Sequence, residues 1–238
     1  MAALCAFYLK LKGLSLKGNN MRLLLLRGGV GTLALTTYFY SIQHMPLASA
    51  VSIQYLSPIL TLIGAHFLLK EKTPLQQALY FFLAFIGVFL IKGVDPRVTF
   101  FEMGVSLVSV FASALAYNLV RMLREQDHEL VVVLYFSLVT IGVVGPFAFT
   151  HWVWPGVKDW FFIIVCIGVF TQMAQVLMTI AYQREPVSNV AIYNYLGIVI
   201  ALGIGYYFFD EKFPFLSLVG MALILISVVM ASRARRGT

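Results

Sequence analysis

Charged residues are scarce in this sequence, and their scarcity excludes an ordinary soluble domain. Asp, Glu, Lys and Arg make up 11% of the 238 residues, whereas 61% are hydrophobic and the mean hydropathy is +0.89. A soluble domain carries roughly a quarter charged residues, which cover its surface. The composition therefore predicts an integral membrane protein whose main solvent is the lipid bilayer.

Acidic residues are absent from the interior of every long apolar run. All ten Asp and Glu residues fall at the ends of these runs or between them. The sequence contains no HExxH motif, no paired acids, and no Ser/His pair with an orienting carboxylate. It therefore predicts no enzyme, no metal site and no cofactor, and it offers no carboxylate as a proton carrier at membrane depth.

Cysteine is also rare, and the basic residues are not arranged for nucleic acid. Cys5 and Cys166 have neither CxxC nor His-linked spacing, which excludes a disulfide framework. The net charge of +7 comes from Lys and Arg in short clusters between apolar runs. Such clusters set the orientation of membrane helices, so we expect no nucleic acid partner.

Apolar runs of about 20 residues, the length that spans a bilayer, follow one another along the chain. Reading them against charged, Pro and Gly breaks predicts an all-α, polytopic helical bundle with eight full spans and a partial one at 1–9. The full spans are 22–43, 47–69, 74–92, 102–121, 130–151, 159–182, 186–209 and 214–232.

The distribution of basic residues predicts the orientation of these spans. Alternating the spans across the bilayer puts 13 of the 17 Lys and Arg residues on one side, which names that side cytoplasmic. The three tryptophans, Trp152, Trp154 and Trp160, fall in a loop on the other side, where indole rings favour the headgroup region. We therefore expect a multi-pass protein of the inner (plasma) membrane with a cytoplasmic C-terminus.

The second half of the chain repeats the first. "LLKEKTP" (68–74) and "FFDEKFP" (208–214) place Glu71 and Glu211 140 positions apart. The same offset aligns, without gaps, Gly28 with Gly168, Ala34 with Ala174, Gln43 with Gln183, Pro46 with Pro186 and Tyr55 with Tyr195. We assign one repeat to 1–95 and the other to 96–238.

Equivalent positions of the two repeats are separated by five spans. Because five is odd, the two copies must face opposite ways in the membrane, which is the architecture of alternating-access transporters. Inverted halves can exchange inward-open and outward-open forms about a shared binding site. The sequence thus predicts a secondary active transporter of a small organic metabolite.

The segments "RGGVGTLALTTYFYSIQHMPLASAVSIQYLSPILTLIGAHFLLKEK" (27–72) and "AYQREPVSNVAIYNYLGIVIALGIGYYFFDEKF" (181–213) carry a resemblance to a known family. The chain resembles the drug/metabolite transporter superfamily, specifically its EamA-domain proteins. This resemblance implies ten helices in two inverted five-helix repeats, and a transporter that acts as an exporter or exchanger of a small metabolite. Against that pattern, we expect the first helix and part of the second to be absent from this sequence, and Ile198 stands opposite Pro58 in the second repeat.

Polar residues recur at helical spacing on one face of several spans, and such stripes turn away from lipid. Ten of them form the predicted substrate site: Thr36, Tyr40, Gln54, Tyr55, Ser113, Tyr117, Gln172, Gln175, Asn194 and Tyr195.

Two alternatives stay open at this point. Serine and threonine stripes also serve close helix packing, whereas a buried amide is bulky for that purpose. A non-transporting membrane subunit, or a truncated and inactive paralogue, is the alternative to a transporter, and a homodimer is compatible with either.

The predicted orientation is tested with topology reporters. A reporter fused after Arg184 is expected to read as cytoplasmic, and one fused after Lys212 as external, because one span separates them and Arg184 belongs to the basic side. Phosphatase and fluorescent-protein activities in cells measure the two sides. The same side for both fusions would contradict the inverted arrangement.

Overall fold

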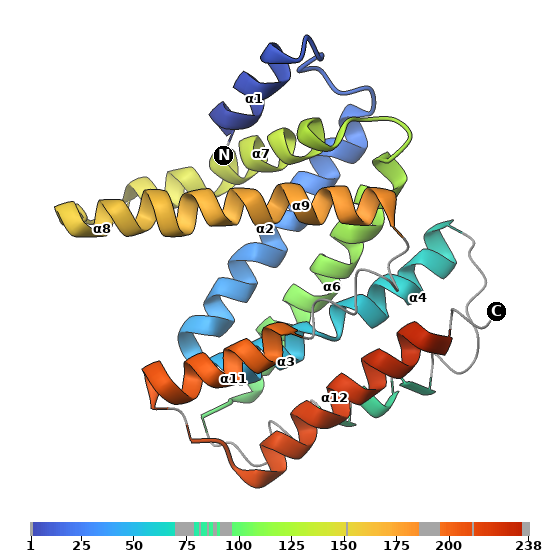
Figure 1. Cartoon of the computed structure of the whole chain (residues 1–238), viewed down its shortest axis with the longest axis vertical. Coiled ribbons are helices and arrows are strands. Elements are labelled where there is room, and N and C mark those ends of the chain that lie inside the picture. Colours follow the sequence, from blue (N-terminus) through green and yellow to red (C-terminus); the bar gives the residue numbers. More distant parts are fainter. Residues whose placement is uncertain are drawn as a thin grey trace. The chain divides into compact units, whose positions relative to one another are not determined.

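The computed structural model describes residues 2–69, 79–80, 82–84, 86–87, 90, 97–150, 152–185, 196–210 and 212–234, and it is all-α over these residues (Figure 1). The helices are α1 (Ala2–Leu11), α2 (Met21–His44), α3 (Leu47–Gln54), α4 (Ser57–Leu69), α6 (Phe100–Leu123), α7 (Glu129–Thr150), α8 (Val157–Phe161), the π-helix η1 (Phe162–Val169), α9 (Phe170–Arg184), α11 (Leu196–Phe209) and α12 (Phe215–Ala234).

The predicted all-α membrane-type fold is confirmed. Within the described residues, four helical stretches are long and apolar enough to cross a membrane: Ser49–Leu68, Phe100–Leu123, Glu129–Thr150 and Asp159–Arg184. The bounds of α2, α6, α7 and α12 lie within two residues of the predicted spans. The predicted span 74–92, and the first half of 186–209, fall mostly outside the described residues.

The predicted continuous span 47–69 is interrupted in the structure. A turn at Tyr55 and Leu56 separates α3 from α4. Pro58 explains the break, because its nitrogen cannot donate to the carbonyl of Gln54 and its ring disfavours helical geometry at Ser57. The turn places the side chains of Gln54 and Tyr55 at the junction of two helices.

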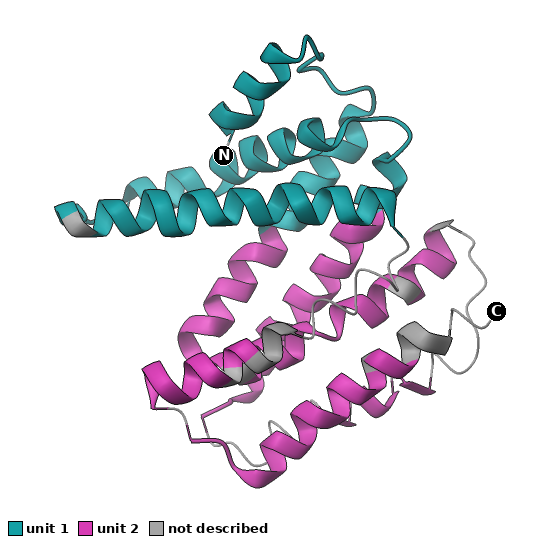
Figure 2. Cartoon of the chain, viewed as in Figure 1, with its two compact units in different colours: residues 1–32, 119–185 teal, residues 33–118, 186–238 magenta. Residues whose placement is uncertain are grey.

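The chain divides into two compact units, and each takes segments from both halves of the sequence (Figure 2). Unit 1 comprises residues 1–32 and 119–185, and unit 2 comprises 33–118 and 186–238. These units are not the repeats expected at 1–95 and 96–238, which describe sequence similarity and stay a prediction. Because each compact unit contains segments from both halves of the sequence, neither half of the sequence forms a compact unit by itself.

In unit 1, α1 and α9 both pack on α7. The first part of α2 crosses α7 closely, because Gly28 has no side chain and a methyl group there would lie 2.7 Å from Val139 Cγ2. One turn later, the hydroxyls of Thr32 and Thr140 share a hydrogen bond of 2.8 Å. Glycine and a hydroxyl pair thus hold this crossing, as is common between membrane helices.

In unit 2, α3 packs against α11 and α12 around a buried core that includes Ile53, Leu56, Met221 and Ile224. Helices α4 and α11 end at Leu69 and Phe209, 140 residues apart. In Figure 1, α4 runs from its junction with α3 towards the right of the view, whereas α11 runs towards the left. Opposite directions of equivalent helices are what an inverted repeat predicts.

The close crossing of α2 and α7 is tested with two adjacent glycines. Gly28→Ala is expected to lower the melting temperature of the detergent-solubilised protein by several degrees, because overpacking a tight contact costs about 1–3 kcal/mol. Gly29→Ala is the matched control: a methyl group at Gly29 would meet no neighbouring atom within 4 Å, so this variant is expected to be neutral or slightly stabilised. Equal melting temperatures for the two variants would contradict the crossing.

Candidate functional site

The side-chain amide of Gln54 lies between two serines of α6 in unit 2. Gln54 Nε2 donates to Ser113 Oγ at 2.8 Å, and Ser109 Oγ donates to Gln54 Oε1 at 3.1 Å. Both ends of the amide are therefore held, and its plane is fixed at the end of α3. The structure thus brings together Gln54 and Ser113, two of the predicted site residues.

The rest of the serine stripe on α6 is used for packing against α2. Ser109 Oγ also lies 2.9 Å from the carbonyl oxygen of Ala34, and Ser106 Oγ donates to Ser41 Oγ at 2.8 Å. All three serines of the stripe are buried. The packing alternative therefore describes Ser106. Ser109 contacts both α2 and the Gln54 amide, and Ser113 contacts the amide.

Three half-buried tyrosines lie close along the chain to residues of this junction. The phenol groups of Tyr38, Tyr55 and Tyr117 are close enough to interact electrostatically with one another. Tyr55 is in the turn between α3 and α4, and Tyr117 is one turn beyond Ser113 on α6. We call Gln54, Ser109, Ser113, Tyr38, Tyr55 and Tyr117 the amide–tyrosine cluster.

Two members of the cluster, Tyr38 and Ser109, are not among the predicted site residues. From α2, the sequence predicts Thr36 and Tyr40 instead of Tyr38. At about 100° per residue, Thr36 and Tyr40 project from the side of α2 opposite to Ala34. Thr36 is exposed, and its hydroxyl donates to the carbonyl of Leu33 at 3.1 Å. The structure therefore does not join these two residues to the cluster.

Tyr40 belongs to an aromatic group at the end of α2. Its ring stacks on that of His44, with centroids 3.9 Å apart, and meets the ring of Phe101 edge-on at 6.2 Å. The helical spacing of Tyr38 and Tyr40 alone does not tell which of the two faces α6. Ser109 of α6 contacts the carbonyl of Ala34, and Tyr38 lies on the same face of α2 as Ala34, so Tyr38 rather than Tyr40 faces α6.

Asn118 is a further buried polar residue of α6 that the sequence reasoning missed. Its Nδ2 donates to the carbonyls of Thr61 and Ala114 at 3.1 and 3.0 Å. The amide sits against Gly64, where a methyl group would lie 2.6 Å from Nδ2. It lies about 40° around α6 from Ala114 but about 140° from Ser113, so it is outside the serine stripe. An amide within a long apolar run was the signal available in the sequence.

The other predicted amides, Gln172 and Gln175, lie on α9 in unit 1. Gln172 is 8% exposed, and its Nε2 donates to Cys5 Sγ at 3.0 Å. The Oε1 atoms of both glutamines are buried and have no hydrogen-bond partner among the described residues. The structure thus keeps these two amides together on one helix. The remaining predicted residues, Asn194 and Tyr195, lie outside the described residues.

Unit 1 also contains a buried cation. Arg27 is 4% exposed, and its guanidinium carbon lies 4.7 Å from the centroid of the Phe136 ring. A methyl group at Gly31 would collide with Arg27 Nη1, so the glycine makes room for the guanidinium. This arrangement is a cation–π contact inside a membrane-spanning helix pair.

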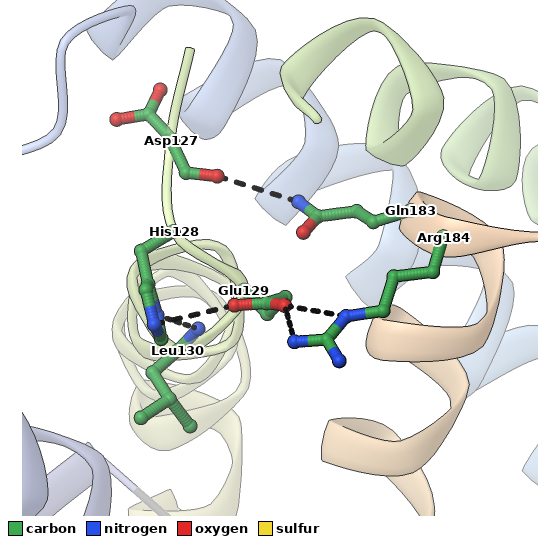
Figure 3. A network of polar contacts seen from close by, with 6 residues as sticks. All are labelled: Asp127, His128, Glu129, Leu130, Gln183 and Arg184. Carbon is green, nitrogen blue, oxygen red and sulfur yellow. Dashed lines mark hydrogen bonds and ion pairs between the residues drawn. The ribbon is translucent and has the colours of Figure 1, made fainter. Parts of the chain in front are cut away.

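A polar network joins the ends of three helices in unit 1 (Figure 3). The backbone carbonyl of Asp127 accepts from Gln183 Nε2 at 3.5 Å, and Glu129 pairs with Arg184 at 2.8 Å. The Asp127 carboxylate is buried and accepts from the backbone N–H groups of Asn19 and Asn20, which precede α2. These bonds satisfy helix-end groups and connect the α6–α7 turn to α2 and α9.

The described residues contain no group of three or more His, Cys, Asp or Glu side chains that could hold a metal ion. Both cysteines are free, Cys5 buried and Cys166 exposed. The chemistry that the described residues offer is therefore hydrogen bonding by amides and hydroxyls, together with contact to aromatic rings.

Known proteins were compared with the whole chain. It is 30% identical over 228 residues to the pseudopaline exporter CntI of Pseudomonas aeruginosa, which covers 94% of this chain and 80% of the exporter. It is 32% identical over 222 residues to an uncharacterized transporter of Helicobacter pylori, covering 90% of this chain and 74% of that protein.

A human relative and a solved structure extend the comparison. Solute carrier family 35 member G1 of Homo sapiens is 28% identical over 255 residues, covering 98% of this chain and 67% of the carrier. A crystal structure with 18% sequence identity superposes with a TM-score of 0.69 over 97% of this chain and 84% of that one, which shows a shared fold. Residues 1–93 and 101–233 match the EamA-like transporter family. The chain therefore belongs to the EamA-like transporter family, within the drug/metabolite transporter superfamily.

Proposed function

We propose that this membrane transporter is a secondary active transporter that exports or exchanges a small organic metabolite by alternating access. The amide–tyrosine cluster is the observation that carries the proposal. It combines a fixed amide, hydroxyls and aromatic rings at a helix interruption in unit 2. Such a cluster suits an organic solute with both an apolar and a hydrogen-bonding part.

The helix interruption at Tyr55 and Leu56 supports this assignment. Transporters commonly form their substrate sites at discontinuous helices near the middle of the membrane, where backbone groups freed by the break can contact the solute. Irregular backbone is tolerated at membrane depth only where protein or a wet cavity surrounds it. Here Pro58 causes the break, and Gln54 and Tyr55 flank it directly.

The internal repeat supports alternating access. Two equivalent helices of unit 2, α4 and α11, run in opposite directions, and both compact units draw on both halves of the chain (Figures 1 and 2). Inverted copies can exchange their packing and so expose a site to either side in turn. Export is the direction that the name of the Pseudomonas relative supports. We place the protein in the inner (plasma) membrane with its C-terminus in the cytoplasm, on the evidence of the basic residues.

Gln54 is the residue that tests the proposed site. In proteoliposomes screened with a metabolite panel, Gln54→Leu is expected to lower the transport rate of the accepted solute at least tenfold, because it removes both hydrogen-bonding ends of the fixed amide. Tyr117→Phe is expected to cause a smaller loss, since the ring stays.

Thr61→Val is the matched control. Thr61 is also buried and follows Gln54 in the same segment, but its hydroxyl donates within α4, to the carbonyl of Ser57 at 2.7 Å. Transport by this variant is expected to stay within twofold of wild type. A protein that folds but transports no member of the panel would sink the proposed function and favour a non-transporting subunit.

A further inference from the structure

Two buried amide oxygens lie next to each other on α9 without a partner. Gln172 and Gln175 are three residues apart, so their side chains leave the helix on the same face, about 5–6 Å apart at Cβ. Their Oε1 atoms are both buried, and neither has a hydrogen-bond partner among the described residues. One side of α9 therefore presents a pair of unsatisfied acceptors.

The neighbouring polar atoms on this face do not fill the gap. Gln172 Nε2 is occupied by Cys5 Sγ at 3.0 Å. The Thr179 hydroxyl, one turn beyond Gln175, donates to the backbone carbonyl of Gln175 at 2.8 Å. The two buried amide oxygens therefore remain acceptors without a partner among the described residues.

Other buried amides of this protein are bonded at more of their atoms. The amide of Gln54 has both ends bonded to serines. Asn118 Nδ2 donates to two carbonyls, although its Oδ1 is also buried without a partner among the described residues. Leaving a buried polar atom unpaired is unfavourable in proteins, and two such atoms on one helix add their costs. A ligand that donates hydrogen bonds would recover them.

We propose that the amide oxygens of Gln172 and Gln175 accept hydrogen bonds from the transported compound, which therefore presents N–H or O–H donors here, as an amine, ammonium or hydroxyl group. This inference rests on the proposed transport function and adds a chemical class to its substrate. A carboxylate or phosphate would place its own lone pairs against the two oxygens, so these groups are excluded from this face.

Binding of matched probes tests the inference without requiring transport. The probes share one aromatic scaffold: 2-phenylethylamine, 2-phenylethanol, phenylethyltrimethylammonium and phenylacetate. Affinities are measured by titration calorimetry on the purified full-length chain in detergent. At least one of the two donor probes, the amine or the alcohol, is expected to bind at least about tenfold more tightly than phenylacetate and the trimethylammonium probe. Comparing the amine with the alcohol shows whether the site prefers an ammonium or a hydroxyl group.

Substitutions of Gln175 separate acceptor from donor roles. Gln175→Glu keeps the shape and offers an oxygen at each position, so the donor probe is expected to bind within threefold of wild type or more tightly. Gln175→Met removes the acceptor at similar volume and is expected to weaken binding about tenfold. Gln172→Met is expected to act in the same direction, and Thr179→Val, on the same face with its hydroxyl bonded internally, serves as the unchanged control.

The outcomes distinguish this inference from the proposed function. Any of three results would overturn the acceptor site: neither donor probe binds, phenylacetate binds as tightly as the donor probes, or Gln175→Glu loses binding while Gln175→Met retains it. Size-exclusion profiles and melting temperatures of each variant confirm that it folds. Binding of a donor probe without transport of it or of any panel member in proteoliposomes would instead overturn the transporter proposal.

Discussion

The architecture depends on one constraint: in lipid, each polar group has to find its partner inside the protein. Helices satisfy the backbone, and several buried hydroxyls described here turn back to a carbonyl of their own helix, as those of Thr32, Ser41, Thr61, Ser137 and Thr179 do. Polar side chains that reach another helix are few and specific. The amide of Gln54 is the clearest case, and it lies where the helix itself is interrupted.

The same constraint explains which parts of the fold could be predicted from the sequence. Helix bounds follow from apolar length, because the bilayer sets how many residues a span needs, and α6 begins and ends within two residues of expectation. The break at Tyr55 was missed, although Pro58 was visible. A proline can bend a helix or interrupt it. The outcome depends on whether neighbouring residues bond the backbone groups that lose their helical hydrogen bonds. Serines 109 and 113 hold the Gln54 side chain beside this break.

The candidate site was predictable in part, for a related reason. Amides in apolar runs are conspicuous, and Gln54, Gln172 and Gln175 were identified from composition and spacing alone. Which tyrosine of α2 would accompany them was not, because Tyr38 and Tyr40 are both compatible with a polar stripe and differ by about 200° around the helix. The contacts of Ser109 with Ala34 and of Ser106 with Ser41 orient α2 against α6, with Tyr38 on the side of Tyr117. Tertiary packing, rather than local pattern, makes that choice.

Positions that the 140-residue offset aligns have different contacts in the structure. Thr32 of α2 pairs with Thr140, whereas Gln172, its counterpart on α9, bonds to Cys5. Gly28 lies tightly against Val139, but for its counterpart Gly168 the nearest contact is a carbonyl of its own π-helix, that of Ile163. Since η1 closes bonds from residue i to i+5, it winds more residues into each turn than α2 does over the matching stretch. The two aligned stretches therefore have equal residue counts but turn through different angles. Because a π segment takes up about one extra residue, a single deletion within Phe162–Val169 that restored α-helical winding would leave α8 facing nearly the same way relative to α9.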